Sequence, residues 1–254
     1  MTSRFVAATR ELHGLTARLE ARVLRSIALR LPAWIHADHL TTLAASAMVA
    51  AAGAYVWARA WPPALHLVNL CLLLNWLGDS LDGTVARLRD QQRPRYGFFV
   101  DHVLDSAGAS LLVLGMAAAG LLSLPLALAL LAAYLLLSVE VYLATYCLGS
   151  FRMSFLGMGA TELRLVLALG HLAALRSPTA TVAGQTWLLF DVGAAVAIPA
   201  LVIAFLTAAV RNAWALSRAE PRPPARSCRY APPPPSDDAR RQPARAETAR
   251  ESPA

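Results

Sequence analysis

The chain of 254 residues is 57% hydrophobic and has a mean hydropathy of +0.47. This composition excludes an ordinary soluble domain and favours a protein that crosses a membrane several times. The formal net charge is +7, and all 23 basic residues are arginine. Beside long apolar segments, this charge favours the anionic headgroups of membrane lipids as partners, and we expect no nucleic acid.

The amino-terminal segment, residues 1–36, is predicted to form an amphipathic juxtamembrane helix. Its large apolar residues recur every three or four positions from Leu12 to Leu31, which is the spacing of one helix face. Most of its arginines fall outside that face. We therefore expect an interfacial helix on the cytoplasmic surface of the membrane. A soluble-type helix packed on the membrane domain is the alternative.

Residues 37–216 are predicted to form an all-α, polytopic membrane domain with six transmembrane helices. The apolar segments are 39–59, 63–86, 97–120, 123–148, 160–176 and 186–211. Most approach the roughly 20 residues that a membrane-crossing helix needs, but the fifth is short. Arginines gather before the first segment and after the second, fourth and sixth, so the positive-inside rule places both termini in the cytoplasm. The Pro/Arg-rich tail, 217–254, is predicted to be disordered.

Four aspartates lie in or at the ends of the second and third segments. Asp79 and Asp82 are three residues apart, and Asp101 and Asp105 are four apart, which puts each pair on one helix face. The short polar connection 88–96 makes the two helices antiparallel neighbours, so all four carboxylates should converge near one membrane face. Charge at membrane depth is costly and usually functional. Four carboxylates together need cations, and oxygen ligands favour Mg²⁺ or Mn²⁺.

Residues beside these aspartates suit a diphosphate ligand. Gly83 and Gly97 would let a ligand or a second backbone approach closely. Arg87 offers planar hydrogen-bond donors to phosphate oxygens. Together with metal ions, this set predicts a phosphoryl-transfer site, in which catalysis rests mainly on positioning and charge neutralisation.

The motif resembles the signature of the CDP-alcohol phosphotransferases, also called CDP-alcohol phosphatidyltransferases. In this chain the pattern reads D-x2-D-G-x2-A-R-x9-G-x3-D-x3-D. The fixed positions are Asp79, Asp82, Gly83, Ala86, Arg87, Gly97, Asp101 and Asp105. Eight fixed positions at set spacings form a specific motif, although it covers a small part of the chain.

The resemblance implies that a substituted phosphate passes from a CDP-linked donor to a hydroxyl acceptor, with release of CMP. Asp79, Asp82 and Asp101 would bind two divalent cations, Mg²⁺ or Mn²⁺. Asp105 would be the general base for the acceptor hydroxyl and would also contact the second metal. The implied CDP-binding residues are Asp79, Asp82, Gly83, Ala86, Arg87 and Gly97. The resemblance also implies a homodimer and a role in phospholipid biosynthesis.

The donor and the acceptor stay open. Family members transfer phosphatidyl from CDP-diacylglycerol to a soluble alcohol, or a phosphoalcohol from a soluble CDP-alcohol to a lipid hydroxyl. We expect CDP-diacylglycerol, because that is the common bacterial use and the composition looks bacterial. The expected location is the bacterial inner membrane, with the site on the cytoplasmic side. Residues 157–162, G-M-G-A-T-E, faintly resemble the ethanolamine- and choline-phosphotransferase branch, which keeps the second route as the alternative.

Polar residues outside the motif are less specific. Arg152 and Arg164 are candidates to hold a phosphate of the acceptor or of a lipid, and ordinary positive-inside charge is the alternative. Thr161 is the expected N-cap of the fifth segment. Asn75 is expected to hydrogen-bond between helices, and Glu140 either faces a polar cavity or pairs with an arginine.

Two other classes of function remain open. A divalent-cation transporter would use the same carboxylates as an ion pathway, but it has no need for Gly83, Ala86 and Arg87. A non-catalytic membrane scaffold would tolerate loss of the aspartates.

Overall fold

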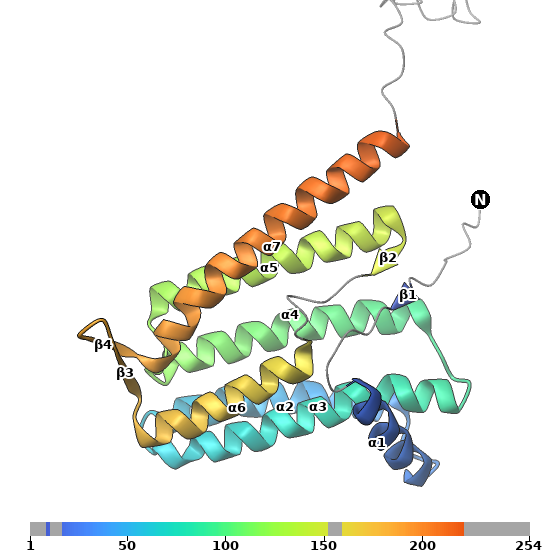
Figure 1. Ribbon diagram of the computed structural model, residues 1–254. Coiled ribbons are helices and arrows are strands. Elements are labelled where there is room, and N and C mark those ends of the chain that lie inside the picture. The colour runs from blue at the N-terminus through green and yellow to red at the C-terminus, as the bar shows by residue number, and fades with distance from the viewer. Residues whose placement is uncertain (1–8, 11–16, 152–158, 221–254) are drawn as a thin grey trace, which may run out of the picture. The chain divides into compact units, whose positions relative to one another are not determined.

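The computed structural model describes residues 9–10, 17–151 and 159–220 (Figure 1). The described residues up to Leu216 belong to one compact unit. The helices are α1 (Ala17–Arg30), α2 (Ala37–Ala58), α3 (Leu65–Leu88), α4 (Pro94–Ala118), α5 (Leu124–Leu148), α6 (Ala160–Arg176) and α7 (Leu189–Ala219). A short 3₁₀ helix, η1 (Pro62–Ala64), leads directly into α3.

Helices dominate the described part of the chain, which confirms an all-α membrane architecture. Five segments are long and apolar enough to span a bilayer: α2, η1 with α3, α4, α5 and α7. Helix α6 has 17 residues and is therefore only about 25 Å long, less than the thickness of a typical hydrocarbon core. The predicted sixth span thus stays a prediction.

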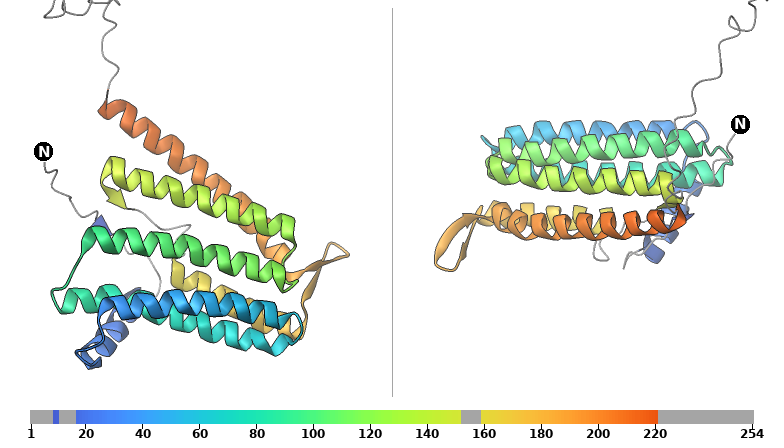
Figure 2. Two further views of the ribbon diagram at one scale, coloured as in Figure 1. Left: turned by 180° about the vertical axis from the view of Figure 1, so that it is seen from behind. Right: turned by 90° about the horizontal axis from the view of Figure 1, so that it is seen from above.

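The helices from α2 to α7 run in alternating directions, with α7 inclined to α2, α3 and α4 (Figures 1 and 2). Helix α2 packs on both α3 and α4, α4 packs on α5, and α3 packs on α6. Many of the buried residues in α2 are alanines: Ala44, Ala47, Ala51, Ala54 and Ala58. Small residues let helix backbones approach closely, which is how membrane helices gain packing energy.

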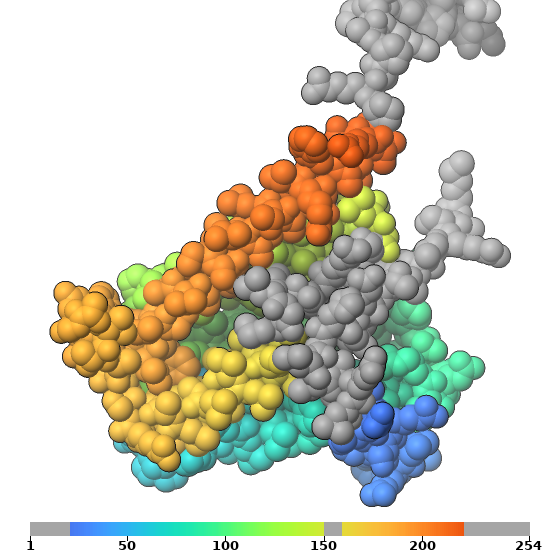
Figure 3. All heavy atoms as spheres, viewed as in Figure 1, coloured from blue at the N-terminus to red at the C-terminus, as the bar shows by residue number. Residues whose placement is uncertain are grey.

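The outward surfaces are apolar, as a lipid environment requires. Figure 3 shows α6 and α7 on one face of the protein. Exposed large apolar residues on these two helices include Leu165, Val166, Leu169, Val196, Ile203 and Val210. Because water would not favour so much exposed apolar surface, this face fits contact with lipid chains.

The amino-terminal segment departs from the prediction of one helix over residues 1–36. Thr9–Arg10 form strand β1, which pairs in parallel with β2 (Ser150–Phe151), so the helical expectation was wrong at these positions. Helix α1 begins at Ala17 and ends at Arg30, two residues before Pro32. Proline disfavours a helical conformation in the residue before it, which accounts for the end. The placement of α1 at a membrane surface stays a prediction.

One side chain makes several hydrogen bonds to the connection between α1 and α2. The Arg89 guanidinium, just after α3, donates hydrogen bonds to four backbone carbonyls. These carbonyls belong to Leu31 (3.1 Å), Pro32 (3.1 Å), Ala33 (3.2 Å) and Ile35 (2.6 Å). Arg89 therefore satisfies carbonyls that follow the end of α1, where no helical partner exists.

A β-hairpin separates α6 from α7. The sequence analysis did not predict it. Strand β3 (Thr179–Val182) pairs antiparallel with β4 (Gln185–Leu188). The two turn residues, Ala183 and Gly184, have φ of 52° and 78°, as a two-residue hairpin turn requires. The last apolar segment was predicted over 186–211, and the structure instead begins α7 at Leu189 and continues it to Ala219.

Candidate functional site

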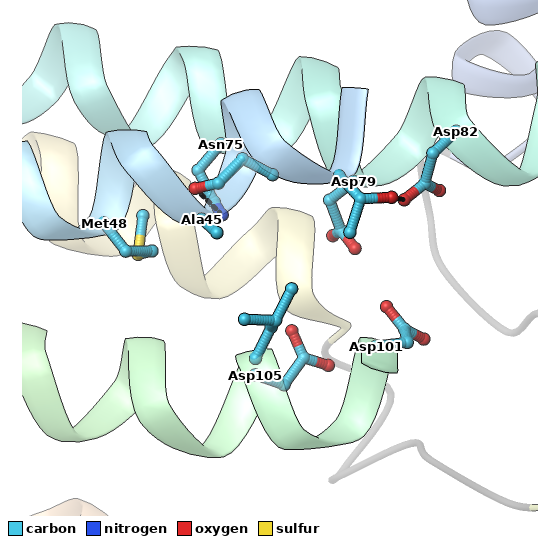
Figure 4. Close-up of a pocket in the computed structure, with 10 residues that line it drawn as sticks. Ala45, Met48, Asn75, Asp79, Asp82, Asp101 and Asp105 are labelled. Carbon is cyan, nitrogen blue, oxygen red and sulfur yellow. Dashed lines mark hydrogen bonds between the residues drawn. The ribbon is translucent and has the colours of Figure 1, made fainter. Parts of the chain in front are cut away.

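The four motif aspartates come together where α3 ends and α4 begins. One carboxylate oxygen from each of Asp79, Asp101 and Asp105 lies within 4.8 Å of the other two. Asp82 lines the same pocket. In Figure 4, Asp79 and Asp82 on α3 face Asp101 and Asp105 on α4. The predicted convergence of both pairs is therefore present in the fold.

The turn between α3 and α4 makes this convergence possible. Helix α3 ends at Leu88, and Asp90 adopts a positive φ of 55°, a conformation that aspartate tolerates better than most residues. The Gln91 amide donates to the Ala86 carbonyl at 2.9 Å, which closes the end of α3. Pro94 then starts α4, where its fixed φ suits a first helical position. The chain reverses within a few residues, so the two helices lie antiparallel.

Helix α2 supplies the third wall of the pocket. Its lining residues are Thr41, Ala44, Ala45 and Met48. The Thr41 hydroxyl lies 2.7 Å from Oδ2 of Asp82 and 3.1 Å from the Ala37 carbonyl. The sequence reading missed Thr41, because a threonine in an apolar segment is common and carries no spacing signal of its own.

Arg164 of α6 joins the site through Asp79. Its Nη2 donates to Asp79 Oδ2 at 2.9 Å, and its Nε donates to Asn75 Oδ1 at 3.0 Å. The side chains of Arg164 and Asp79 are 16% and 25% exposed. Asn75 also donates to the Ala44 carbonyl of α2 at 3.2 Å, so its expected interhelical hydrogen bonding is confirmed. The sequence named Arg164 without identifying Asp79 as its partner.

The residues that the resemblance assigns to CDP lie in the last part of α3, from Asp79 to Arg87, and in the first turn of α4, at Gly97. Arg87 is exposed and donates to Thr84 Oγ1 at 3.3 Å. A Cβ added at Gly83 would lie 3.2 Å from Arg87 Nη1, the mobile end of a side chain. A Cβ added at Gly97 would meet nothing within 4 Å. Gly97 thus borders open space, whereas the Arg87 side chain covers the position beside Gly83, and the expected ligand contact at both glycines stays a prediction.

The donor set fits a hard divalent cation. Carboxylates offer several oxygen lone pairs each, so Asp79 can accept the hydrogen bond from Arg164 and still present oxygen to a metal. Mg²⁺ and Mn²⁺ prefer such oxygen ligands. Asp79, Asp101 and Asp105 come from two helices that the short turn holds together, which gives the ligand set a fixed geometry.

Other sequence-based assignments need correction or lie outside the described structure. Arg152 falls outside the described residues. Glu140 accepts a hydrogen bond from Asn212 Nδ2 at 2.6 Å, so it joins α5 to α7 through an asparagine rather than an arginine. The N-cap of α6 is Gly159, not Thr161, and Glu162 accepts from the Gly159 amide at 2.9 Å. A glycine cap has no side chain, which is why the sequence did not reveal it.

A buried polar cluster lies deeper in the bundle and was also missed. The Tyr55 hydroxyl lies 2.7 Å from Nε2 of His171, and Nδ1 of His171 lies 2.6 Å from Oδ1 of Asn69. Tyr55 and His171 are both fully buried. The three residues join α2, α6 and α3, respectively. A histidine inside an apolar segment was the available signal.

No model of a protein family matches this chain, and no curated protein matches it. The residues themselves supply the support for a function. This support consists of four convergent carboxylates, their spacing along the chain, and the basic and small side chains around them.

Proposed function

We propose that this protein is a metal-dependent membrane transferase of the CDP-alcohol phosphotransferase type. It moves a substituted phosphate from a CDP-linked donor to a hydroxyl acceptor and releases CMP. The observation that carries the proposal is the convergence of Asp79, Asp101 and Asp105, whose carboxylate oxygens lie within 4.8 Å of one another, with Asp82 on the same pocket. The linear spacing of these residues, which resembles that family's motif, adds independent support.

The proposed roles follow from the chemistry of each side chain. Asp79, Asp82 and Asp101 hold two divalent cations, Mg²⁺ or Mn²⁺. When bound, these cations supply charge neutralisation for the diphosphate. Asp105 accepts the proton of the acceptor hydroxyl at a carboxylate oxygen, as a general base does. Arg87 donates to diphosphate oxygens, and the spaces beside Gly83 and Gly97 admit the donor.

The membrane character supports a lipid substrate. In the described part of the chain, five helices are long and apolar enough to span a bilayer. The site lies in the halves of α3 and α4 that are nearer to their connecting turn, and Figure 4 shows its aspartates. We favour CDP-diacylglycerol as donor and a soluble alcohol as acceptor, with transfer from a CDP-alcohol to a lipid hydroxyl as the alternative. The proposed setting is a homodimer in the bacterial inner membrane, with the site facing the cytoplasm.

Release of CMP by the purified protein in detergent tests this function. One set of assays pairs CDP-diacylglycerol with a panel of soluble alcohols, and a second pairs CDP-ethanolamine or CDP-choline with diacylglycerol. We expect release that requires Mg²⁺ or Mn²⁺ and stops when EDTA is added. Transport of Mn²⁺ into proteoliposomes without nucleotide, and no CMP in any assay, would contradict the proposal and favour a cation transporter.

The assigned base has its own test. Asp105→Asn should retain binding of the CDP-linked donor and lose most turnover, typically about 10²–10⁴-fold for a general base. Asp90→Asn is the matched control, because Asp90 is exposed in the turn and asparagine suits its positive φ. Full activity in the Asp105 variant would remove this residue from the proposed mechanism.

A further inference from the structure

Arg164 is a cation of the described part of the chain that the fold places against the carboxylate cluster. It comes from α6, whereas the four aspartates come from α3 and α4. Its guanidinium donates to Asp79 Oδ2 at 2.9 Å and to Asn75 Oδ1 at 3.0 Å. Because Asn75 and Asp79 are four residues apart on α3, they lie on one helix face and accept from two different N–H groups of the planar guanidinium.

The same face of α6 carries a second attachment to α3. His171 lies seven residues after Arg164, two helical turns along, and contacts Asn69 and Tyr55. Asn69 Nδ2 also donates to the Ala168 carbonyl at 3.4 Å. These polar contacts fix both the rotation and the depth of α6, so Arg164 has little freedom to leave Asp79.

We propose that Arg164 is a positioning residue for the metal site, acting through Asp79. By holding Oδ2 of Asp79, it restricts the rotation of this carboxylate beside Asp101 and Asp105. It also offsets part of the repulsion among four neighbouring carboxylates. This inference rests on the proposed function, because it assumes that the cluster holds divalent cations. Hydrogen-bonding partners of metal-binding carboxylates commonly raise metal affinity in this way.

An arginine beside a metal site can also lower the affinity for the metal, so the sign of the change distinguishes the two roles. A guanidinium near a divalent cation repels it, so a merely competing arginine would weaken metal binding. Its removal would then tighten binding. An orienting arginine and a competing arginine therefore predict changes in metal affinity of opposite sign.

Mn²⁺ binding to the purified full chain in detergent, followed by the electron paramagnetic resonance signal of free Mn²⁺, measures this affinity without substrate. We expect Arg164→Gln to weaken Mn²⁺ binding by about 10-fold or more. Arg164→Lys keeps the positive charge and loses the paired N–H donors of the guanidinium fork. Its affinity for Mn²⁺ should therefore fall between those of Arg164→Gln and the wild type. Arg176→Gln, which changes the exposed arginine at the other end of α6, should bind as the wild type does.

Each outcome separates this inference from the proposed function. Unchanged or tighter Mn²⁺ binding in Arg164→Gln would overturn the positioning role and leave the transferase proposal standing. Absence of Mn²⁺ binding in the wild-type chain would overturn both. Should Arg164→Gln fail to fold, Arg164→Lys decides the matter, and wild-type affinity in that variant would overturn the role of the guanidinium fork.

Discussion

Gly78 stands one residue before Asp79 and sets how closely α3 approaches α2. A Cβ added there would lie 2.5 Å from the Leu40 carbonyl oxygen and 2.9 Å from the Ala44 Cβ. Both atoms belong to the helix that carries Thr41. The absence of a side chain at Gly78 therefore lets α2 reach the pocket, which is a packing role that the motif does not include.

Substitution of Gly78 should consequently destabilise the bundle. Gly78→Ala forces the backbones of α2 and α3 apart, and overpacking of this kind costs about 1–3 kcal/mol of stability. Gly53→Ala on α2 is a matched control, since a Cβ there meets nothing within 4 Å. Thermal unfolding in detergent should show a lower Tm for the first variant and an equal or higher Tm for the second. Equal Tm values for Gly78→Ala and the wild type would contradict the close approach.

For single residues, the sequence predicted that the carboxylates converge, but it did not predict which side chains contact them. Asp79, Asp82, Asp101 and Asp105 are rare residues in apolar segments, so their spacing carried information. Thr41 is an ordinary residue whose place in the site depends on how α2 crosses α3. Such a contact between segments far apart in the chain leaves no local pattern.

Among the elements, the connection from α1 to α2 depends most on one side chain. Arg89 occupies four carbonyls of residues 31–35, and Arg93 forms an ion pair with Asp38 near the start of α2. The same turn that brings the aspartates together thus also anchors α1. The arginines of this turn were predicted as cytoplasmic positive charge, and Arg89 additionally has this structural role.

Loss of the Arg89 contacts should loosen residues 31–35 without dispersing the bundle. In Arg89→Gln we expect faster amide hydrogen exchange over α1 and the segment that follows it, because several carbonyls lose a charged donor. Arg22→Gln, at an exposed position on α1, is the matched control and should leave exchange unchanged. Equal protection in both variants would show that other contacts hold this segment.

Element boundaries show where sequence patterns lose information. The first five apolar segments were predicted close to the limits of their helices, because a long run of apolar residues leaves few other conformations, whereas α7 continues to Ala219, well beyond the predicted end at residue 211. The β3–β4 hairpin was missed, because its turn is Ala183-Gly184 rather than the asparagine–glycine or aspartate–glycine pair typical of such turns. The boundary between hairpin and α7 was misplaced for the same reason.

For the whole molecule, the main question of topology concerns α6. If α6 crosses the membrane, the chain spans it six times and both termini face the cytoplasm, as the arginine distribution predicts. A fluorescent protein that matures only in the cytoplasm, fused to either terminus, should then be bright. A chain truncated after Gly120 and fused there should be dark, since α4 would deliver it to the other side. Fluorescence at one terminus alone would contradict six crossings.

The pairing of Arg164 with Asp79 also bears on biosynthesis. A 17-residue segment that carries an arginine is a poor substrate for insertion on its own, because the charge resists entry into lipid. The counter-charge lies on α3, which leaves the ribosome earlier and already holds its place beside α2 and α4. Membrane integration of α6 should therefore wait for that three-helix intermediate. A substitution of Asp79 would then act twice, on the proposed metal site and on the membrane integration of α6.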